Sequence, residues 1–427
     1  MSRSSSFYGW KLLAAYWLIL FANFGFPLYG ASVVNTDMAA ALHWDRTQLG
    51  LAYSIYQLML GLPAPLISIL IARKGARFTT TLGCSIVVAG ALLMSSVVHT
   101  AQQTYIFFSF VMGLGAMTGG ILVGQTAVNR WFTRFKGLAI TIVHTATTFG
   151  GFVAAKLLDS LIRAAGGNWR AGWWLMAALS AVSAILAISF VRERPSDLGQ
   201  FPDGATSEQA ASFAVRAETT ARVHKTNEEW KFSEALRTPA IWLILISLLG
   251  FSAGYPVFLA HGNAHLRDLG YTPAQAASSF SIMVLSSLFG TLFFAAISDL
   301  IEPRLVWAVA SIFFAIGLLL SLSAAGPFGL YLYAIVMGGS YGICFSAMMV
   351  LPANYYGLKG YPPVISLFMV VGTIAAASAA TAAGAVFDRT HSYAPIFHTC
   401  AALSVLASIL LLVMKPASKT PQGSPIS

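Results

Sequence analysis

Charge is what this sequence has least of. Of its 427 residues, 9% are charged and 57% are hydrophobic, whereas a soluble domain carries about 25% charged residues. So little charge cannot cover the surface of a soluble protein of this length. Phe occurs 29 times and Trp 10 times, which is typical of helices that face lipid and place aromatic rings at its boundaries. The composition therefore indicates a membrane protein.

Cysteine and recognisable catalytic patterns are also scarce. The three cysteines, Cys84, Cys344 and Cys400, lie in apolar runs without C-x-x-C spacing, so we expect no disulfide framework. The sequence has no G-x-x-x-x-G-K-[ST] phosphate loop, which argues against drive by ATP. It also has no metal-ligand cluster or catalytic triad. We therefore expect neither an enzyme nor a cofactor.

Long apolar runs fill most of the chain. A spanning helix needs about 20 apolar residues, and twelve runs meet this requirement. They lie at approximately 11–35, 47–71, 78–98, 104–128, 138–162, 172–191, 240–262, 273–298, 304–323, 328–351, 362–386 and 393–414. The first run is longer than the core of a signal peptide, so we expect it to be retained as a helix.

The longest connection divides the runs into six and six. Residues 192–238 are polar and carry both charge signs. We predict an all-α membrane protein with two six-helix bundles. The expected parts are an N-terminal bundle at 1–191, a linker at 192–238, a C-terminal bundle at 239–414 and a tail at 415–427.

The net charge of +10 indicates topology rather than a nucleic-acid partner, because the basic residues sit in short loops. With the N-terminus in the cytoplasm, 19 of the 25 Lys and Arg fall on the cytoplasmic side and five outside, with Lys156 left inside a helix. Cytoplasmic loops carry such an excess. We therefore predict cytoplasmic termini and linker, in a bacterial-type inner membrane.

The two halves of the sequence repeat. Gln48 and Ser54 recur 227 positions later as Gln275 and Ser281, and the run Val111-Met112-Gly113 recurs 225 positions later. Parallel repeats of six helices are typical of carriers whose two bundles rock about a central site.

The loop after the second run carries a family motif. The segment Ala72-Arg73-Lys74-Gly75-Ala76-Arg77 resembles the D-R-x-G-x-R loop of the major facilitator superfamily, with Ala in place of the acid. The equivalent segment from Asp299 to Arg304 keeps the acid and the final Arg but lacks the Gly. In that family these residues link the bundles on the cytoplasmic side. The resemblance implies a gate that includes Arg73, Gly75, Arg77, Asp299 and Arg304, with an acid in the second half alone.

Further segments are similar to the oxalate–formate antiporter family, a branch near the monocarboxylate porters. They are Tyr8-Gly9-Trp10, Asn129-Arg130-Trp131-Phe132, Lys136-Gly137-Leu138-Ala139, Arg237-Thr238-Pro239 and Gly338-Gly339-Ser340-Tyr341. This resemblance implies transport of organic acids. However, the basic residues with which that family holds its anion, in helices 8 and 11, are missing, and Thr291 falls near the expected Arg.

Side chains near the middle of the predicted helices are the candidate substrate contacts. Depth follows from the helical rise of about 1.5 Å per residue, and polar groups at mid-depth face a cavity or another helix. The candidates are Asn23, Phe24, Gln57, His144, Tyr255, Ser287, Thr291 and Tyr341. An interhelical hydrogen bond is the alternative for Asn23 and Gln57, and packing is the alternative for His144. Tyr255 precedes Pro256, where a bend would suit a gate.

Lys156 and the glycines of the fourth predicted helix are two further features to interpret. Lys156 near the outer end of helix 5 either pairs with Asp159 one turn on and reaches toward water or attracts anions from outside. The glycines of helix 4, including Gly119 and Gly120, are typical of close helix packing.

Together these patterns predict a secondary carrier for a small organic acid. A dianion would be poorly matched to the available donors, so we expect a monocarboxylate, moved by proton symport or anion exchange. Its partners would be the substrate, protons and the lipid bilayer, and the carrier would be a monomer. An exporter of neutral or hydrophobic molecules is the alternative, and a transporter-like membrane sensor is a third.

Overall fold

The computed structural model describes residues 7–132, 135–204, 223–224, 226, 228, 230–298, 300–324 and 326–416, with the backbone alone for 136–138, 141 and 358–362. These residues are helical almost throughout, and no strand occurs among them. The longer elements are α1 (Gly9–Leu20), η1 (Phe21–Gly30), α2 (Ala31–Ala41), α3 (Arg46–Gly61), α4 (Ala64–Ser96), η2 (Tyr105–Met112), α7 (Ile121–Trp131), α8 (Lys136–Ala164), α9 (Arg170–Phe190), α12 (Pro239–Asp268), α13 (Pro273–Ile297), α14 (Pro303–Ser323), α15 (Gly326–Thr390) and α16 (Ala394–Val413).

Within the described residues, ten helices are long and apolar enough to cross a membrane. Two further segments complete the twelve-helix arrangement: α8, and α3 continued through Pro63 into the first part of α4. Glycines with positive φ separate helices that follow one another closely. Gly75 (φ 84) divides α4, and Gly357 (φ 68) divides α15. The expected all-α membrane fold is confirmed.

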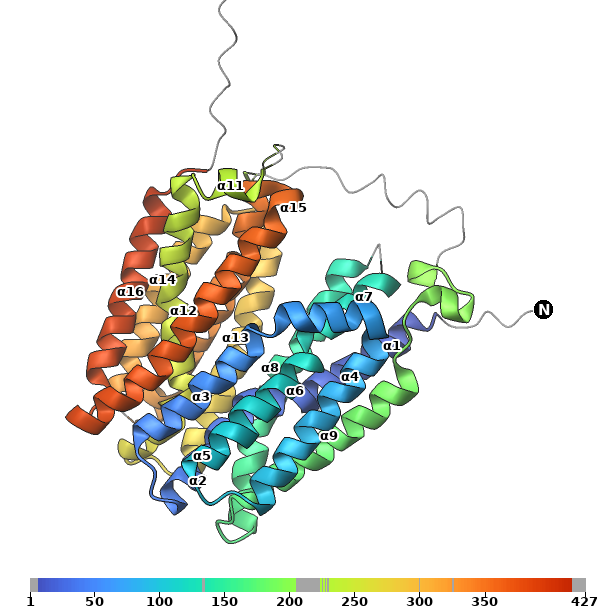
Figure 1. The fold of residues 1–427 in the computed structure, drawn as a ribbon. Helices are drawn as coiled ribbons and strands as arrows, with labels where there is room; N and C mark the ends of the chain where they lie inside the picture. Colours follow the sequence, from blue (N-terminus) through green and yellow to red (C-terminus); the bar gives the residue numbers. More distant parts are fainter. Residues whose placement is uncertain are drawn as a thin grey trace, which may run out of the picture.

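The elements from α1 to α9 and those from α12 to α16 form two groups that lie side by side (Figure 1). The first group is joined by packing of α4 against α9, and the second by packing of α14 against α15 and α16. Between the groups, α3 packs against α15 and α13 packs against α8. The exact domain boundaries expected from the sequence remain a prediction.

The sequence repeat has a visible local counterpart. Asp45 accepts a hydrogen bond from the backbone N–H of Gln48 at 2.6 Å, and the Gln48 side chain accepts one from the Asp45 N–H. Thr272 and Gln275 form the same reciprocal cap at the start of α13. Such a capping box satisfies N–H groups that a helix leaves without partners, so equivalent helices of the two halves begin in the same way.

The chain segments next to the termini and to residues 205–222 all lie at one end of the helices, the upper end in Figure 1. We call this the terminal end and the other the opposite end. The ribbons of the two groups lie close together at the opposite end and separate toward the terminal end.

Two spanning helices of the first half are irregular. Residues Phe21–Gly30, which contain Pro27, form wide π-helical turns between α1 and α2. The fourth spanning helix, Ala101–Trp131, is broken where the short helix α6 (Gly113–Thr118) ends and α7 begins. Gly119 (φ −99°, ψ 8°) and Gly120 (φ −93°, ψ −150°) lie between them outside helical geometry. The close packing expected of these glycines is present, since a Cβ on Gly83 of α4 would lie 2.1 Å from the Gly119 backbone nitrogen. The sequence analysis did not anticipate the break.

Candidate functional site

The π-helical turns of the first helix carry two of the predicted contacts. Asn23 has no exposed surface, and neither its Nδ2 nor its Oδ1 atom has a hydrogen-bond partner among the described residues. Phe24 is 8% exposed. A buried amide without partners loses free energy relative to one in water. The interhelical hydrogen bond that was the alternative for Asn23 is therefore not formed in the described part of the chain.

The second and fifth spanning helices contribute two further candidates, Gln57 on α3 and His144 on α8. The Gln57 side chain is partly buried, and its Oε1 atom has no partner within the described residues. His144 of α8 contacts Gln125 of α7, with the two Nε2 atoms 2.5 Å apart. The amide –NH2 donates in this arrangement, so the ring nitrogen that faces it accepts and carries no proton. Sequence reasoning singled out His144 but missed Gln125.

Aromatic rings dominate the corresponding region of the second half. Tyr255 of α12 and Tyr341 of α15 stack in parallel, with centroids 3.5 Å apart and planes 6° from parallel. Phe251 meets the Tyr341 ring edge-on at 5.8 Å, and Phe345 lies 6.0 Å from it. Tyr255 is 1% exposed, and the helix continues through Pro256. The structure thus brings two of the predicted residues into direct contact.

Ser287 and Thr291 both bond to backbone carbonyls. The Ser287 hydroxyl donates to the carbonyl of Val284 at 2.7 Å, and Thr291 donates to that of Gly342 at 3.3 Å. A Cβ on Gly342 would lie 2.0 Å from the Ser287 carbonyl oxygen, so α13 and α15 touch through their backbones here. In this conformation the Thr291 hydroxyl joins α13 to α15, whereas the Ser287 hydroxyl bonds within its own helix.

Polar contacts join the two halves at the opposite end. Arg46, at the start of α3, binds both carboxylate oxygens of Asp268, at the end of α12, at 2.8 and 3.0 Å. Asp388 of α15 accepts from the backbone N–H groups of Arg46 and Thr47 and from the Thr47 hydroxyl. It therefore caps the positive end of α3. Arg267 adds a pair with Asp37 of α2 at 2.5 Å.

Close backbone packing continues this closure inward. A Cβ on Gly50 would lie 2.3 Å from the Ala380 carbonyl oxygen. The Ser54 hydroxyl donates to the Ala377 carbonyl, and His261 of α12 bonds through Nε2 to the Ala380 carbonyl at 2.9 Å. The predicted seventh helix ended at residue 262, but α12 runs to Asp268, so His261 lies deep inside it.

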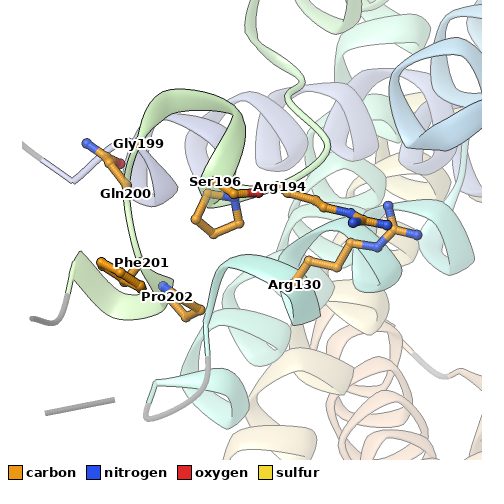
Figure 2. A pocket seen from close by; sticks show the side chains of 8 residues that line it. Arg130, Arg194, Ser196, Gly199, Gln200, Phe201 and Pro202 are labelled. Carbon is orange, nitrogen blue, oxygen red and sulfur yellow. The ribbon is translucent and has the colours of Figure 1, made fainter. Parts of the chain in front are cut away.

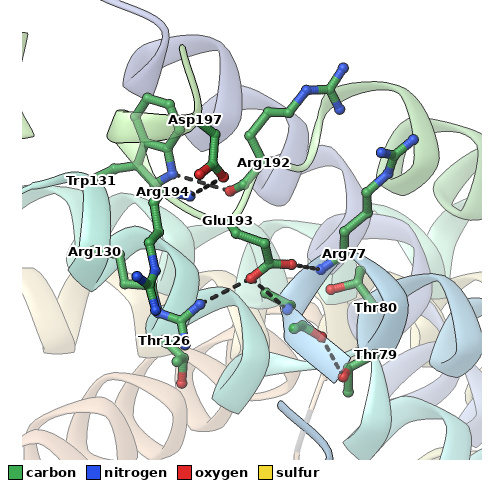
Figure 3. A network of polar contacts seen from close by, with 12 residues as sticks. Arg77, Thr79, Thr80, Thr126, Arg130, Trp131, Arg192, Glu193, Arg194 and Asp197 are labelled. Atoms are coloured by element: carbon green, nitrogen blue, oxygen red, sulfur yellow. Dashed lines mark hydrogen bonds and ion pairs between the residues drawn. The ribbon is translucent and has the colours of Figure 1, made fainter. Parts of the chain in front are cut away.

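At the terminal end, the carboxylate of Glu193 organises the loop that carries Gly75 (Figure 3). It accepts from the backbone N–H groups of Ala76 at 2.9 Å and Arg77 at 2.8 Å, and it pairs with Arg130 at 3.0 Å. A Cβ on Gly75 would lie 2.5 Å from Glu193 Oε1, so this contact requires glycine. The acid position of the motif is Ala72 in the first half, but Glu193 supplies a carboxylate to this loop from beyond the end of α9, and the sequence analysis did not anticipate it.

The other predicted gate residues are placed as follows. The side chains of Arg73 and Arg77 are exposed. Arg304 donates to the Met414 carbonyl, while its Nε has no partner within the described residues. Asp299 lies outside the described residues. The roles of these residues in a gate stay a prediction.

Lys156 is exposed on α8, and the predicted pair with Asp159 was wrong. Asp159 is held by Arg163, whose Nε donates to it at 2.9 Å and whose Nη2 makes a second contact. Residues four apart face each other on a helix as well as residues three apart do, and the guanidinium adds a second donor. Lys156 is therefore not committed to Asp159, which is compatible with its predicted role as an anion lure.

A cavity of about 650 Å³ lies at the terminal end, lined by Arg130, Arg194 and residues between Pro195 and Pro202 (Figure 2). Arg130 is already paired with Glu193, and none of the predicted substrate contacts lines the cavity. Among the described residues, no group of three His, Cys, Asp or Glu is placed to hold a metal ion.

Comparison with known proteins places the chain in a family. The sequence profile described as "Major Facilitator Superfamily" matches residues 12–264 and 260–427. This protein belongs to the major facilitator superfamily. That is a family of transporters rather than of enzymes, as expected from the sequence.

Similar proteins include monocarboxylate transporters. Human monocarboxylate transporter 2 is 22% identical over 425 residues, covering 95% of this chain and 85% of the relative. The uncharacterized MFS-type transporter YcxA of Bacillus subtilis (strain 168) is 23% identical, covering 93% of this chain and 94% of that one. These relatives agree with the monocarboxylate-porter branch that the motifs indicated.

Solved structures support the fold. A D-xylose–proton symporter superposes with a TM-score of 0.74 at 13% identity, over 96% of this chain and 98% of the symporter. The nucleoside transporter NupG superposes with a TM-score of 0.69 at 15% identity, over 94% of this chain and 99% of NupG. At such identities the likeness speaks for the fold alone.

Proposed function

We propose that this major facilitator protein is a secondary carrier that moves a small monocarboxylate with an apolar or aromatic body by alternating access. One observation carries the proposal. The first half presents Asn23, a buried amide without a hydrogen-bond partner among the described residues, and the second half presents the stacked Tyr255 and Tyr341; the helical rise predicts a similar depth for all three. A polar contact in one half and an aromatic surface in the other suit a molecule with a polar head and an apolar body. The similarity to monocarboxylate transporters supports this substrate class.

The proposed orientation puts both termini and residues 192–238 in the cytoplasm of a bacterial-type inner membrane. It rests on the excess of Lys and Arg in the loops of that side. In this orientation, the contacts of Arg46, Arg267 and Asp388 close the carrier toward the outside. The conformation is then the inward-facing one of the alternating-access cycle.

The donors available in the middle of the molecule favour a single negative charge. A bare carboxylate away from water needs a compensating charge or several hydrogen bonds. The predicted contacts Asn23, Gln57 and Tyr341 are neutral, and His144 is the one titratable group among them. Coupling is by proton symport or by anion exchange, and His144 is the candidate proton carrier.

One observation favours a second function. Helix α13 and residues 363–388 of α15 contain no Lys or Arg, although an anion carrier commonly uses such residues. An exporter of neutral or hydrophobic molecules is therefore the rival. A transporter-like sensor is the third possibility, and uptake measurements separate it from both carriers.

The deciding experiment compares each acid with its amide. Purified protein is melted in the presence of lactate, benzoate and phenylacetate, and separately with lactamide, benzamide and phenylacetamide, because a bound ligand raises the melting temperature. Uptake of the most stabilising compound into proteoliposomes is then measured against protein-free liposomes. We expect stabilisation and uptake of at least one acid and little effect of its amide. Equal stabilisation by acid and amide would favour the exporter of neutral molecules, and binding without uptake would favour the sensor.

A further inference from the structure

The break in the fourth spanning helix leaves three amide groups without hydrogen-bond acceptors among the described residues. The N–H groups of Ile121, Leu122 and Val123 begin α7, and their usual acceptors one turn earlier are displaced by the non-helical Gly119 and Gly120. Within the described residues no side chain accepts from them either, and Gly120 has no side chain that could cap the helix. A helix N-terminus of this kind carries a partial positive charge inside the membrane-spanning region.

An independent observation points to a ligand at this break. A Cβ built on Gly119 would lie 3.2 Å from Nδ2 of Asn23, so the Asn23 amide faces the break from the neighbouring helix. Asn23 is fully buried, and both of its side-chain polar atoms lack partners in the described part of the chain. The Phe24 ring lies beside Gly120, 3.0 Å from where a Cβ on that residue would stand. A polar amide and an apolar ring therefore lie against the two glycines that directly precede these three N–H groups.

We propose that the break is the carboxylate-binding site of the carrier, in which the N–H groups of Ile121 to Val123 and Nδ2 of Asn23 donate hydrogen bonds to the substrate carboxylate. This inference rests on the proposed transport of a monocarboxylate and names the part of the protein that binds its charge. Helix N-termini bind anions through backbone N–H groups and the helix dipole together. Broken spanning helices of other carriers present half-helix N-termini to anionic groups in the same way.

The site accounts for the absence of basic residues from α13 and from residues 363–388. A helix N-terminus carries about half a positive charge, which suits one carboxylate and not two. Ile121 and Leu122 are partly exposed, whereas Gly119 and Gly120 are buried. Gln125 lies one turn farther along α7, and its side chain contacts His144 of α8, which links a candidate proton carrier to the first turns of α7.

The two glycines keep the site open. A Cβ on Gly119 would enter the space beside the Asn23 amide, and one on Gly120 would lie 2.2 Å from the Ala116 carbonyl oxygen. Any larger residue would therefore fill the position of the ligand or force the break to rearrange.

The test uses Asn23→Leu with a matched control, Asn35→Leu. Asn35 lies on α2 of the same spanning helix, is equally buried and also lacks partners for both side-chain atoms within the described residues. Affinity for benzoate, phenylacetate and lactate is measured by titration of purified full-length protein, with the three amides as neutral probes. We expect Asn23→Leu to weaken acid binding about tenfold, the effect of losing a hydrogen bond to a charged group, and Asn35→Leu to leave it within about twofold.

Hydrogen exchange supplies a readout that does not depend on transport. In the wild type, a peptide covering residues 118–124 should exchange more slowly with the acid than with its amide, because the carboxylate occupies the N–H groups of α7. Asn23→Leu should reduce that protection.

The outcomes separate the site from the proposed function. If the wild type prefers none of the three acids over its amide, the proposed function is wrong and the site falls with it. If the acid is preferred but Asn23→Leu binds it as the wild type does and residues 118–124 gain no protection, the anion is held elsewhere. The site is then refuted while monocarboxylate transport stands.

Discussion

The fourth and tenth spanning helices occupy equivalent positions in the two halves, yet the fourth is broken near its middle and the tenth is continuous there. The offset of 225 residues places Cys344 and Phe345 opposite Gly119 and Gly120. The tenth helix runs without interruption through the first pair, whereas the fourth breaks at the second. Two consecutive glycines weaken a helix because each loses more backbone entropy on ordering than other residues do. A local exchange of residues has thus turned one copy of a repeated helix into two half-helices.

The first and seventh helices show the same asymmetry. Gly25-Phe26-Pro27 recurs 229 positions later as Gly254-Tyr255-Pro256. The first copy lies in wide π-helical turns, often a mark of a functional site, whereas α12 continues past the second. The first half therefore offers an amide and backbone N–H groups that lack acceptors in the described part of the chain, and the second offers stacked tyrosines. We infer that the halves divide the proposed substrate between them, with the charged head held by the first and the apolar body by the second.

The largest expected effect tests why the tenth helix stays regular. A Cβ on Gly338 would lie 1.9 Å from the Met283 carbonyl oxygen, whereas one on Gly339 would meet its nearest neighbour at 3.8 Å. Overpacking against backbone costs about 1–3 kcal/mol, so Gly338→Ala should lower the melting temperature of the purified protein clearly. Gly339→Ala should be neutral or slightly stabilising, because Ala favours a helix more than Gly does. Equal melting temperatures for the two variants would contradict the backbone contact.

The next prediction converts the fourth helix toward the tenth. In Gly119→Ala the added methyl group lies against the Asn23 amide, so the KM for a transported acid should rise about tenfold, as for a lost hydrogen bond to a charged group. The matched change in the other half, Cys344→Ala, removes a buried thiol from a continuous helix. It should leave KM within about twofold. An equal rise in both variants would mean that the break has no special part in binding.

The fold could be predicted from the sequence, but the break at Gly119 and Gly120 was not. Twelve apolar runs and the repeat of Gln48 as Gln275 were enough to predict the fold. The length of each apolar run and the repeat between the halves can both be read from the order of residues. The Gly119-Gly120 pair was visible in the sequence, and a Gly-Gly dipeptide is a known helix interruption. It was interpreted as a site of close helix packing, because glycines in membrane helices can allow close packing as well as interrupt the helix.

Contacts between residues distant in the sequence were the part that could not be predicted. Glu193 reaches the N–H groups of Ala76 and Arg77 across more than one hundred residues, and no local motif announces it. Asn23, Tyr255 and Tyr341 were chosen by depth alone. Depth identifies which residues share a layer of the membrane. It does not show that Tyr255 stacks on Tyr341 or that the Asn23 amide lacks a hydrogen-bond partner among the described residues.

A third prediction compares the two loops at the terminal end. Glu193→Gln removes the negative charge that stabilises the helix beginning at Ala76 and that pairs with Arg130. A charge at a helix N-terminus and an ion pair whose side chains are 32% exposed contribute about 1 kcal/mol together. The variant should melt a few degrees lower and transport more slowly. Glu302→Gln in the other half is the control, because Glu302 accepts from the His224 N–H and caps no Gly75-like turn. A larger loss in Glu302→Gln would reverse the assignment of the two loops.

A fourth, smaller effect concerns the joint between the halves. Arg46 and Asp268 are 23% and 36% exposed, and an ion pair of that exposure contributes about 0.5–1 kcal/mol. Arg46→Gln should therefore shift the carrier a few-fold away from the conformation closed at the opposite end. Accessibility of a cysteine introduced near Gln57 to a membrane-impermeant reagent measures the shift. Exchanging the charges in Arg46→Asp with Asp268→Arg should restore the wild-type labelling, and unchanged labelling in Arg46→Gln would show that Asp388 holds the joint without it.

The smallest expected effect concerns proton coupling, which again sets one half against the other. Lys136-Gly137 and Lys359-Gly360 align the fifth and eleventh helices, and this offset of 223 residues places Leu367 opposite His144. The first half therefore carries a titratable side chain where the second has an apolar one. In the structure the Gln125 –NH2 faces the ring nitrogen of His144, so a protonated ring would meet a donor with a donor. Protonation requires the Gln125 amide to turn over and present its oxygen, and this links the charge of His144 to the first turns of α7.

A positive charge there would strengthen carboxylate binding, so uptake should rise as the pH falls through the range in which histidine titrates. His144→Gln keeps a polar side chain but cannot titrate, and it should flatten the pH profile while changing uptake at neutral pH by about twofold or less. Leu367→Ala, at the equivalent position, should keep the wild-type profile. If the profile of His144→Gln still follows that of the wild type, the proton is carried by another group, and coupling by anion exchange becomes the better proposal.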